Sequence, residues 1–214
     1  MEATSEKPNA PAFELIGGDV CLDFINTLDD RPSAQPKELI VSFDDLGRFA
    51  EQSGILKQEQ VNKLREQVRI LPHEAEAAVS RAIELREALH TVFSAQIARR
   101  VPPPPALATL NAYIREAGQH SRLVLRKGRY EWRFDEPVSE ETASTRDVIL
   151  WPIARAAANL LHSPDLAMVR ACSAPTCRWF FLDTSKNHHR RWCDMKVCGN
   201  RAKVKRFYAK KKTA

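Results

Sequence analysis

Four cysteines near the C-terminal end form the clearest chemical pattern of the chain. Cys172 and Cys177 are separated by four residues, Cys193 and Cys198 by another four, and fifteen residues lie between the two pairs. Such pairs suit a tetrahedral zinc site, because each short spacer lets one turn of backbone present two thiolates to the same ion. The sequence therefore predicts one structural zinc ion bound by all four cysteines.

Two disulfides, or unconnected buried thiols, are the alternatives. Disulfides need an oxidising compartment, and residues 1–12 are polar and proline-punctuated, without the apolar core of a secretory signal. No run of the sequence reaches the length of a membrane span. We therefore expect a cytoplasmic protein with reduced cysteines and no membrane partner. The fifth cysteine, Cys21, sits among Val20, Leu22 and Phe24, which predicts a buried thiol.

Basic residues concentrate around the cysteines. From Arg170 to Ala214 there are thirteen Lys and Arg against two acids, whereas the rest of the chain carries twenty against twenty-five. This asymmetry is typical of a module that binds a polyanion, and a solvated charged surface is the alternative. Together with a metal site and interleaved aromatic residues, it favours nucleic acid. The expected phosphate contacts are Arg190, Arg191, Arg201, Lys203, Arg206 and Lys210.

A small zinc fold must position these side chains. We expect short strands over 169–172 and 179–182, a polar turn over 183–189, and a helix that begins near Gly199 or Asn200. The free N–H groups of that helix would face the thiolates. Val204, Phe207 and Tyr208 share one of its faces, which is predicted to point inward. A hairpin, a knuckle and a helix around one zinc give a treble-clef-like finger, whose folding depends on the metal.

The residues Cys198-Gly199-Asn200-Arg201, with Arg190-Arg191-Trp192-Cys193 before them, resemble the signature of the CGNR zinc-finger family. Chains of that family begin with an ABATE domain, and Gly17-Gly18, Leu22-Asp23-Phe24 and Asn26-Thr27 match its N-terminal pattern. The resemblance implies a stress-induced transcription regulator that binds DNA. We expect a disordered N-terminus over residues 1–12, an ABATE-like helical domain over 13–165 and the CGNR finger over 166–214.

Hydrophobic periodicity predicts a mainly α fold, with a helical N-terminal domain that contains one β-hairpin. Helices are expected over 20–28, 42–52, 58–68, 73–99, 106–116 and 142–162, the last with a kink at Pro152, and a short strand over 13–16. The hairpin turns at Lys127-Gly128. The longest helix carries the apolar stripe of Leu85, Leu89, Val92 and Phe93 and should be central. Because no flexible linker precedes the finger, the finger should be fixed against the helical body.

Three polar residues share one face of the first predicted helix, under a glycine turn: Asp23, Asn26 and Thr27. They could line a pocket for a small-molecule effector. The favoured alternative is that they bind neighbouring backbone and fix the turn that follows. The sequence contains no phosphate-binding glycine loop, nucleophile elbow or His-Glu metal helix. A site with four cysteine ligands is also closed to substrate, so we do not expect an enzyme.

Two functions therefore remain. The first is a transcription regulator whose finger binds double-stranded DNA while the helical domain senses an effector or forms a homodimer. The second is a zinc module that binds RNA or a protein partner. Trp179 and Trp192 could stack on unpaired bases, whereas a basic helix over 201–212 could enter a major groove. The sequence does not decide between these polymers.

Overall fold

The computed structural model describes residues 12–134 and 147–212, without the side chains of residues 209, 210 and 212. Most of the N-terminus that was predicted to be disordered, and the first residues of the helix predicted over 142–162, lie outside these ranges. Seven α-helices are described: α1 Val20–Ile25, α2 Phe43–Gln52, α3 Gln58–Ile70, α4 Pro72–Ile97, α5 Pro104–Gln119, α6 Leu150–Leu161 and α7 Asn200–Lys212. The fold is mainly α, as predicted.

The described strands form three separate antiparallel pairs. They are β1 Leu28–Asp29 with β2 Lys37–Glu38, β3 Ser121–Arg126 with β4 Arg129–Phe134, and β5 Val169–Ala171 with β6 Phe180–Leu182. The second pair is the predicted hairpin, and the third begins the predicted finger. The first pair was not predicted, because two-residue strands carry too few residues for an alternating pattern.

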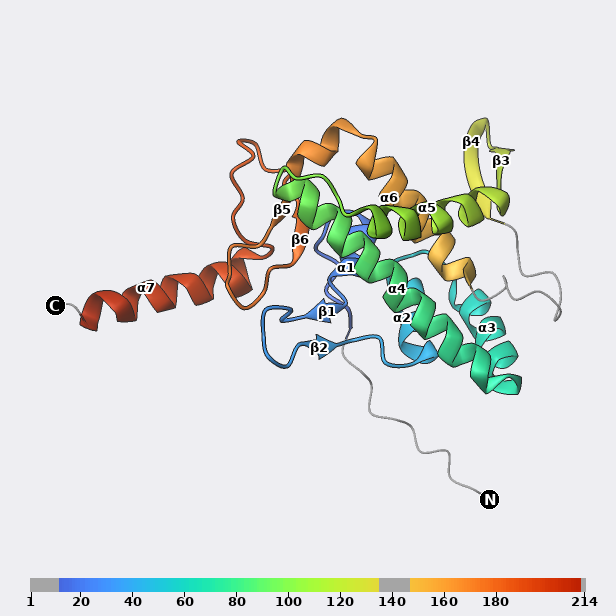
Figure 1. Cartoon of the computed structure of the whole chain (residues 1–214), viewed down its shortest axis with the longest axis horizontal. Helices are drawn as coiled ribbons and strands as arrows, with labels where there is room; N and C mark the ends of the chain where they lie inside the picture. Colours follow the sequence, from blue (N-terminus) through green and yellow to red (C-terminus); the bar gives the residue numbers. More distant parts are fainter. Residues whose placement is uncertain (1–11, 135–146, 213–214) are drawn as a thin grey trace, which may run out of the picture.

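Helix α4 is the central element of the body. Its Leu85, Leu89 and Phe93 are fully buried and Val92 is nearly so, which confirms the predicted stripe. Helices α1, α2, α3, α5 and α6 all pack against α4 (Figure 1). Among the described residues, no helix is both long and apolar enough to cross a membrane.

Local signals explain where several helices begin. Ser42 accepts a hydrogen bond from the Asp45 N–H while the Asp45 side chain accepts from the Ser42 N–H, a capping box that starts α2. Prolines open α4 and α5, where a missing N–H costs no helical hydrogen bond. The same rule corrects the predicted kink: α6 starts at Leu150, so Pro152 lies in its first turn and not in its interior.

Two further predictions near the N-terminus were wrong. Residues 13–16 do not form a strand; the Phe13 N–H donates to Gln52 Oε1 at 2.8 Å. Helix α1 ends at Ile25 and not at 28, because Asn26 forms its C-cap. The polar residues that follow it are used for contacts with distant elements, as described below.

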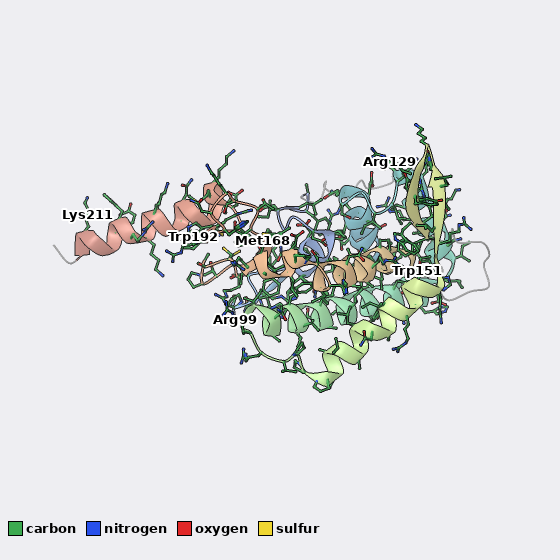
Figure 2. All side chains as sticks on the ribbon, turned by 90° about the horizontal axis from the view of Figure 1, so that it is seen from above. Arg99, Arg129, Trp151, Met168, Trp192 and Lys211 are labelled. Atoms are coloured by element: carbon green, nitrogen blue, oxygen red, sulfur yellow. The ribbon has the colours of Figure 1, made fainter. Side chains whose placement is uncertain are left out.

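The finger is packed directly onto the body. After α6, the short 3-10 helix η2 (Pro164–Met168) leads into β5. Val169 and Phe180 belong to the main core, whereas the four zinc-site cysteines, Trp179 and Phe181 form a second, smaller core. At the other side of the finger, the π-helical turn η3 (Met195–Gly199) continues into α7, which projects away from the body (Figures 1 and 2).

Candidate zinc centre and nucleic-acid interface

The four predicted cysteines converge on one point. Cys172, Cys177, Cys193 and Cys198 are all buried free thiols, and their Sγ atoms all lie within 4.8 Å of one another. The Cys177–Cys193 and Cys193–Cys198 sulfur distances are 3.5 and 3.6 Å. Sulfurs around a tetrahedral zinc at about 2.3 Å are about 3.8 Å apart. The cluster therefore fits one zinc ion, and its sulfurs are too far apart for disulfide bonds.

The electrostatics of the cluster favour a bound cation once its thiols are deprotonated. Hydrogen bonds from Cys177 and Cys193 lower the pKa of Cys172 to about 2. The hydrogen bond with Cys172, together with burial, raises the pKa of both Cys177 and Cys193 above that of an ordinary thiol. Four buried thiolates this close together would repel one another, and a divalent ion removes that repulsion. These four residues hold one structural zinc ion, and they leave no coordination position open.

The first cysteine pair is positioned by the finger hairpin. The Cys172 N–H donates to the Trp179 carbonyl at 2.8 Å, which extends the β5–β6 pairing by one residue. The Cys177 N–H donates to the Ala174 carbonyl at 3.1 Å, which closes the turn between the two cysteines. A regular strand pair and a tight turn thus bring the two sulfurs to one side.

Asp183 organises the loop that leads to the second cysteine pair. Its carboxylate is fully buried and accepts hydrogen bonds from the Ser185 N–H and hydroxyl and from the Arg190 N–H at 2.9 Å. Burial alone would raise the pKa of Asp183, but these hydrogen bonds outweigh it and lower the pKa. The residue lies in a segment that the sequence described only as polar and turn-like, so its structural role was missed.

Arg190, a predicted phosphate contact, is used inside the finger. Its Nε donates to the Trp192 carbonyl at 2.9 Å, its Nη2 donates to the Cys193 carbonyl, and its guanidinium lies 4.6 Å from the centre of the Phe181 ring. These contacts hold the backbone that carries Cys193. The donors of Arg190 are therefore directed at the finger itself.

Arg201, another predicted phosphate contact, is exposed but faces acids. It lines a cavity of about 300 Å³ beside the cysteines, together with Glu14, Asp29, Asp30 and Asp194. A phosphate at this position would meet several carboxylates. Arg201 thus shares this cavity with Cys177, Cys193 and Cys198 of the zinc centre and with the four acids.

Three other predicted contacts point into solvent. Arg191, Lys203 and Arg206 are exposed, and the Arg191 guanidinium lies 5.4 Å from the centre of the Trp192 ring. Lys210 belongs to α7, but its side chain lies outside the described part of the structure. Lys203 and Arg206 share one face of α7, and the exposed Lys205 lies on another.

The predicted inward face of α7 was wrong. Val204, Phe207 and Tyr208 are 54, 58 and 61 % exposed. Periodicity correctly shows which residues share a face of the helix, but it does not show whether another element covers that face. Helix α7 packs mainly against η3 at its own start and then leaves the body, so these side chains have little to pack against.

The polar residues of the first helix connect the body to the finger. Asn26 Nδ2 donates to the Phe180 carbonyl at 2.9 Å, and the Phe180 N–H donates to Asn26 Oδ1 at 2.8 Å. The Thr27 hydroxyl donates to the Phe24 carbonyl, and Asp23 accepts from the Gly17 N–H at 2.7 Å. These are contacts with backbone, as in the favoured alternative, although the partner of Asn26 is distant in sequence. A small-molecule pocket at these three residues stays a prediction.

The glycine turn touches the finger as well. The Gly17 carbonyl accepts from the Leu182 N–H at 2.8 Å. Gly18 has a φ of 80°, and a Cβ there would lie 3.2 Å from the Leu182 Cβ. A side chain at Gly18 would thus strain the backbone and crowd β6.

His90 of α4 completes the contact with β6. Its ring stacks on Phe180 with centroids 5.2 Å apart and an interplanar angle of 4°. Burial, with a smaller contribution from the Arg31 guanidinium, lowers the pKa of His90 to about 4. The imidazole is therefore neutral at physiological pH, as a ring stacked inside an interface should be.

The sequence did not identify the buried Arg86 and its ion pair with Glu38. Arg86 of α4 is 2 % exposed, binds both Glu38 carboxylate oxygens at 2.6 Å and donates to the Thr27 hydroxyl at 3.2 Å. It also donates to Glu87 at 3.0 Å. The sequence around Arg86 does not distinguish it from a solvent-exposed arginine of a long helix. Its burial depends on the position of β2, which carries Glu38.

The fold and the four-cysteine centre define a zinc-finger protein whose helical domain is packed against its finger. Comparison with protein families gives two adjacent matches. Residues 18–164 match ABATE, described as "Putative stress-induced transcription regulator", and residues 168–211 match the CGNR zinc finger. Since the first match alone covers more than half of the chain, this protein belongs to the ABATE family, with a CGNR zinc finger at its C-terminal end. A search of curated proteins finds no match.

Both family descriptions concern a regulator or a zinc finger, and neither describes an enzyme. The coarse class is thus a zinc-finger regulator.

Proposed function

We propose that this protein is a DNA-binding transcription regulator and that α7 is its main DNA contact. The observation that supports this most is the exposure of α7. Between Asn200 and Lys212 the helix carries basic residues and no acid, and the described side chains among them are exposed: Arg201, Lys203, Lys205, Arg206 and Lys211. A projecting basic helix fits the electrostatic requirement of a phosphate backbone.

The dimensions of α7 also suit duplex DNA. An α-helix with its side chains is about 10–12 Å wide, close to the about 12 Å width of the major groove. Because α7 leaves the body at η3, the rest of the molecule need not approach the groove (Figure 1). Lys203 and Arg206 would contact phosphates, and the exposed Val204 could meet the methyl groups of thymine.

The acidic body supports the same orientation. Residues outside the finger carry more acids than bases, so the body would be repelled by a polyanion. The finger would then approach DNA with α7 first. Arg190 would hold the second cysteine pair in place, and Arg201 would bridge toward the acidic residues of the body, so neither is proposed as a main phosphate contact.

Single-stranded nucleic acid is the second candidate, favoured by one observation. Phe207 and Tyr208 are exposed between cations on α7, and aromatic rings in this setting stack on unpaired bases. They fit that role better than Trp179, which is 9 % exposed, or the half-buried Trp192.

Competition binding separates these candidates. Duplex DNA, single-stranded DNA and RNA of equal length are compared at one fixed salt concentration, followed by a salt titration with the preferred polymer. We expect duplex DNA to bind most tightly. Lys203→Ala should weaken all duplex sequences alike and reduce the log–log salt slope by about 1, the value for one lost phosphate contact.

Arg129→Ala serves as the matched control. Arg129 is an exposed cation at the tip of the β3–β4 hairpin, at the far end of the molecule from Lys211 (Figure 2). An equal loss of slope in both variants would contradict α7 as the interface. Preference for a single strand, with loss of affinity in Phe207→Ala, would instead support the second candidate.

The compartment is part of the proposal. All five cysteines are reduced in the structure, and thiols together with a thiolate zinc centre fit a reducing environment. We propose the cytoplasm as its compartment.

A further inference from the structure

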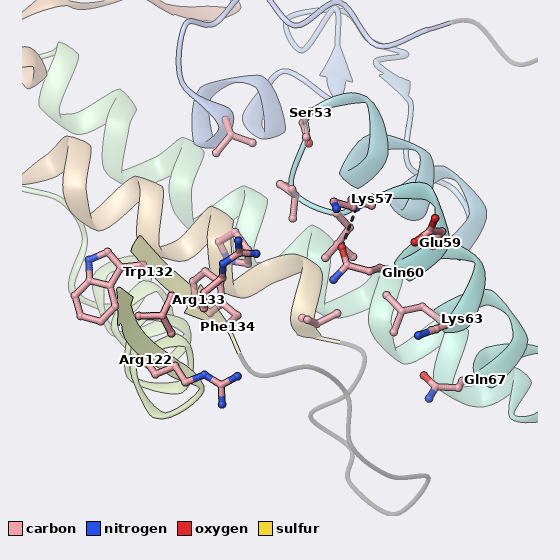
Figure 3. Close-up of a pocket in the computed structure, with 18 residues that line it drawn as sticks. Ser53, Lys57, Glu59, Gln60, Lys63, Gln67, Arg122, Trp132, Arg133 and Phe134 are labelled. Carbon is pink, nitrogen blue, oxygen red and sulfur yellow. Dashed lines mark hydrogen bonds between the residues drawn. The ribbon is translucent and has the colours of Figure 1, made fainter. Parts of the chain in front are cut away.

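A groove of about 870 Å³ lies on the helical body, on the opposite side from α7. Its walls come from the connection between α2 and α3, from α3, from the β3–β4 hairpin and from the start of α6 (Figure 3). The volume falls within the range of about 300–1,000 Å³ that holds small organic ligands. None of the metal or nucleic-acid residues discussed above lines it.

The floor of the groove is apolar. Leu56, Leu64 and Val148 are 9, 2 and 5 % exposed and belong to the main core. Phe134 and Pro152 add apolar surface from the hairpin and from α6. A ligand that covers this floor would remove apolar area from water, which favours binding.

The rim is cationic. Lys57 and Lys63 stand on the α3 side, while Arg122 and Arg133 stand on the hairpin side (Figure 3). Within the described part of the chain, Glu59 is the one acid among the lining residues. Because the body as a whole carries more acids than bases, this gathering of cations is a local feature and not a reflection of its composition.

The two charged walls are held in place. The Arg155 guanidinium lies 3.8 Å from the centre of the Trp132 ring. Phe134 lies against Trp151 with centroids 6.3 Å apart, and Trp151 stacks on His120 at 4.2 Å. On the other wall, the Gln60 side chain accepts from the Lys57 N–H at 3.0 Å and fixes the start of α3. The groove is therefore formed without a ligand, which lowers the entropic cost of binding.

Arg133 has a competing partner on the hairpin. Its Nη2 lies 3.4 Å from Glu131, and both side chains are nearly half exposed. Exposed pairs of this kind contribute little. Arg133 therefore remains part of the cationic rim despite its contact with Glu131.

We propose that this groove is a ligand site for a small organic anion with a flat apolar part, such as an aryl carboxylate or sulfonate. The apolar part would lie on Leu64 and Phe134, and the anionic group would be bound at the rim by Lys57 and Lys63. This site is separate from Asp23, Asn26 and Thr27 and goes beyond nucleic-acid binding, so its test does not depend on the polymer that α7 contacts.

The test uses two fluorescent probes on the full-length protein. Anilinonaphthalene sulfonate is an aryl anion, and phenylnaphthylamine is its uncharged analogue. Both are titrated into the wild type, into the double variant Lys57→Gln/Lys63→Gln and into the control Arg69→Gln. Arg69 also lies on α3, but it is highly exposed, pairs with Glu66 and does not line the groove.

We expect the double variant to bind the anionic probe about tenfold more weakly, because it lacks two partly exposed charge contacts. The uncharged probe should bind all three proteins alike, and Arg69→Gln should bind both probes like the wild type. Gln67→Glu, which adds a negative charge to the lining, should weaken the anionic probe without removing a cation. Failure of the wild type to bind the anionic probe, or equal affinity in the double variant, would overturn the proposal.

Discussion

Asn26 and Phe180 lie 154 residues apart and exchange two hydrogen bonds, of 2.9 and 2.8 Å. The side-chain amide of Asn26 thereby pairs with the backbone of β6 as a neighbouring strand would. Both residues are buried, at 4 % exposure each. The first helix of the body thus completes the edge of the finger sheet.

Asn26→Ala should lower the free energy of unfolding by about 2–4 kcal/mol, because it leaves the buried N–H and carbonyl of Phe180 without partners. Urea denaturation of the zinc-loaded protein measures this. Asn159→Ala, at an exposed position of α6, is the matched control and should change stability by less than about 0.5 kcal/mol. Equal stabilities in the two variants would contradict the role of Asn26.

Removal of zinc should destabilise the helical body as well as the finger. Val169 and Phe180 of the finger strands belong to the main core, so a finger unfolded by a chelator withdraws apolar surface from the body. We expect the melting midpoint of the helices, followed by their far-UV signal, to fall when zinc is removed. Cys198→Ser should lower this midpoint as well. A body that melts unchanged after complete zinc loss would show that the two parts fold separately.

Cys21→Ala is the control for that experiment. Cys21 is fully buried in α1, away from the metal cluster, and burial raises the pKa of its thiol. This variant should keep one zinc per chain in metal analysis, even if it loses some stability through its small cavity. A loss of zinc in Cys21→Ala would indicate that the ligand set is wrong.

The adjacent residues Arg190 and Arg191 should give opposite phenotypes. Arg190→Ala removes the donors bound to the Trp192 and Cys193 carbonyls and should weaken zinc retention and thermal stability. Arg191→Ala removes an exposed cation and should leave stability within about 0.5 kcal/mol while reducing the salt slope of nucleic-acid binding. Zinc retention under chelator and a salt titration measure the two effects, and a reversed pattern would refute both assignments.

His90 predicts a pH dependence of stability. Its pKa is about 4 in the fold and about 6.5 in an unfolded chain. Between these two pH values the unfolded state binds more protons than the folded state. The contribution of His90 to the free energy of unfolding is therefore fully present above about pH 6.5 and is lost as the pH falls toward 4. The surrounding charges are Arg31, Arg86 and Glu87.

The measurement compares the wild type with His90→Gln from neutral pH down to about pH 4. The difference in unfolding free energy between the wild type and His90→Gln should shrink as the pH falls. Protonation of the zinc ligands affects both proteins equally, so it does not change this difference. Parallel curves would mean that His90 titrates alike in the folded and unfolded chains.

Sequence patterns predicted the elements well where local physics decides them. The cap at Ser42 and the apolar stripe of α4 are local signals, and the structure follows them. The prolines were expected to precede the helix over 106–116, but Pro104 and Pro105 form the start of α5. The four cysteines were equally clear, because their spacing carries the ligand geometry.

Features that depend on distant partners were not predictable in this way. Tyr208 was expected to be buried because its face of α7 is apolar, yet no local signal reports that the helix leaves the body. Arg86 carries no local signal of burial, yet it is 2 % exposed and binds Glu38 and Thr27, which lie far away in sequence. The partner of Asn26 likewise became visible only once β6 was placed beside α1.

The position of Phe180 has an evolutionary consequence. The two family matches divide the chain between residues 164 and 168, as if two modules had been joined there. Phe180 lies after that division but packs among the side chains that precede it. If recombination at this division joined the finger to another helical domain, that domain would need equivalents of Asn26, Gly18 and His90 to contact the finger. Contacts across this division therefore join the ABATE domain to its finger.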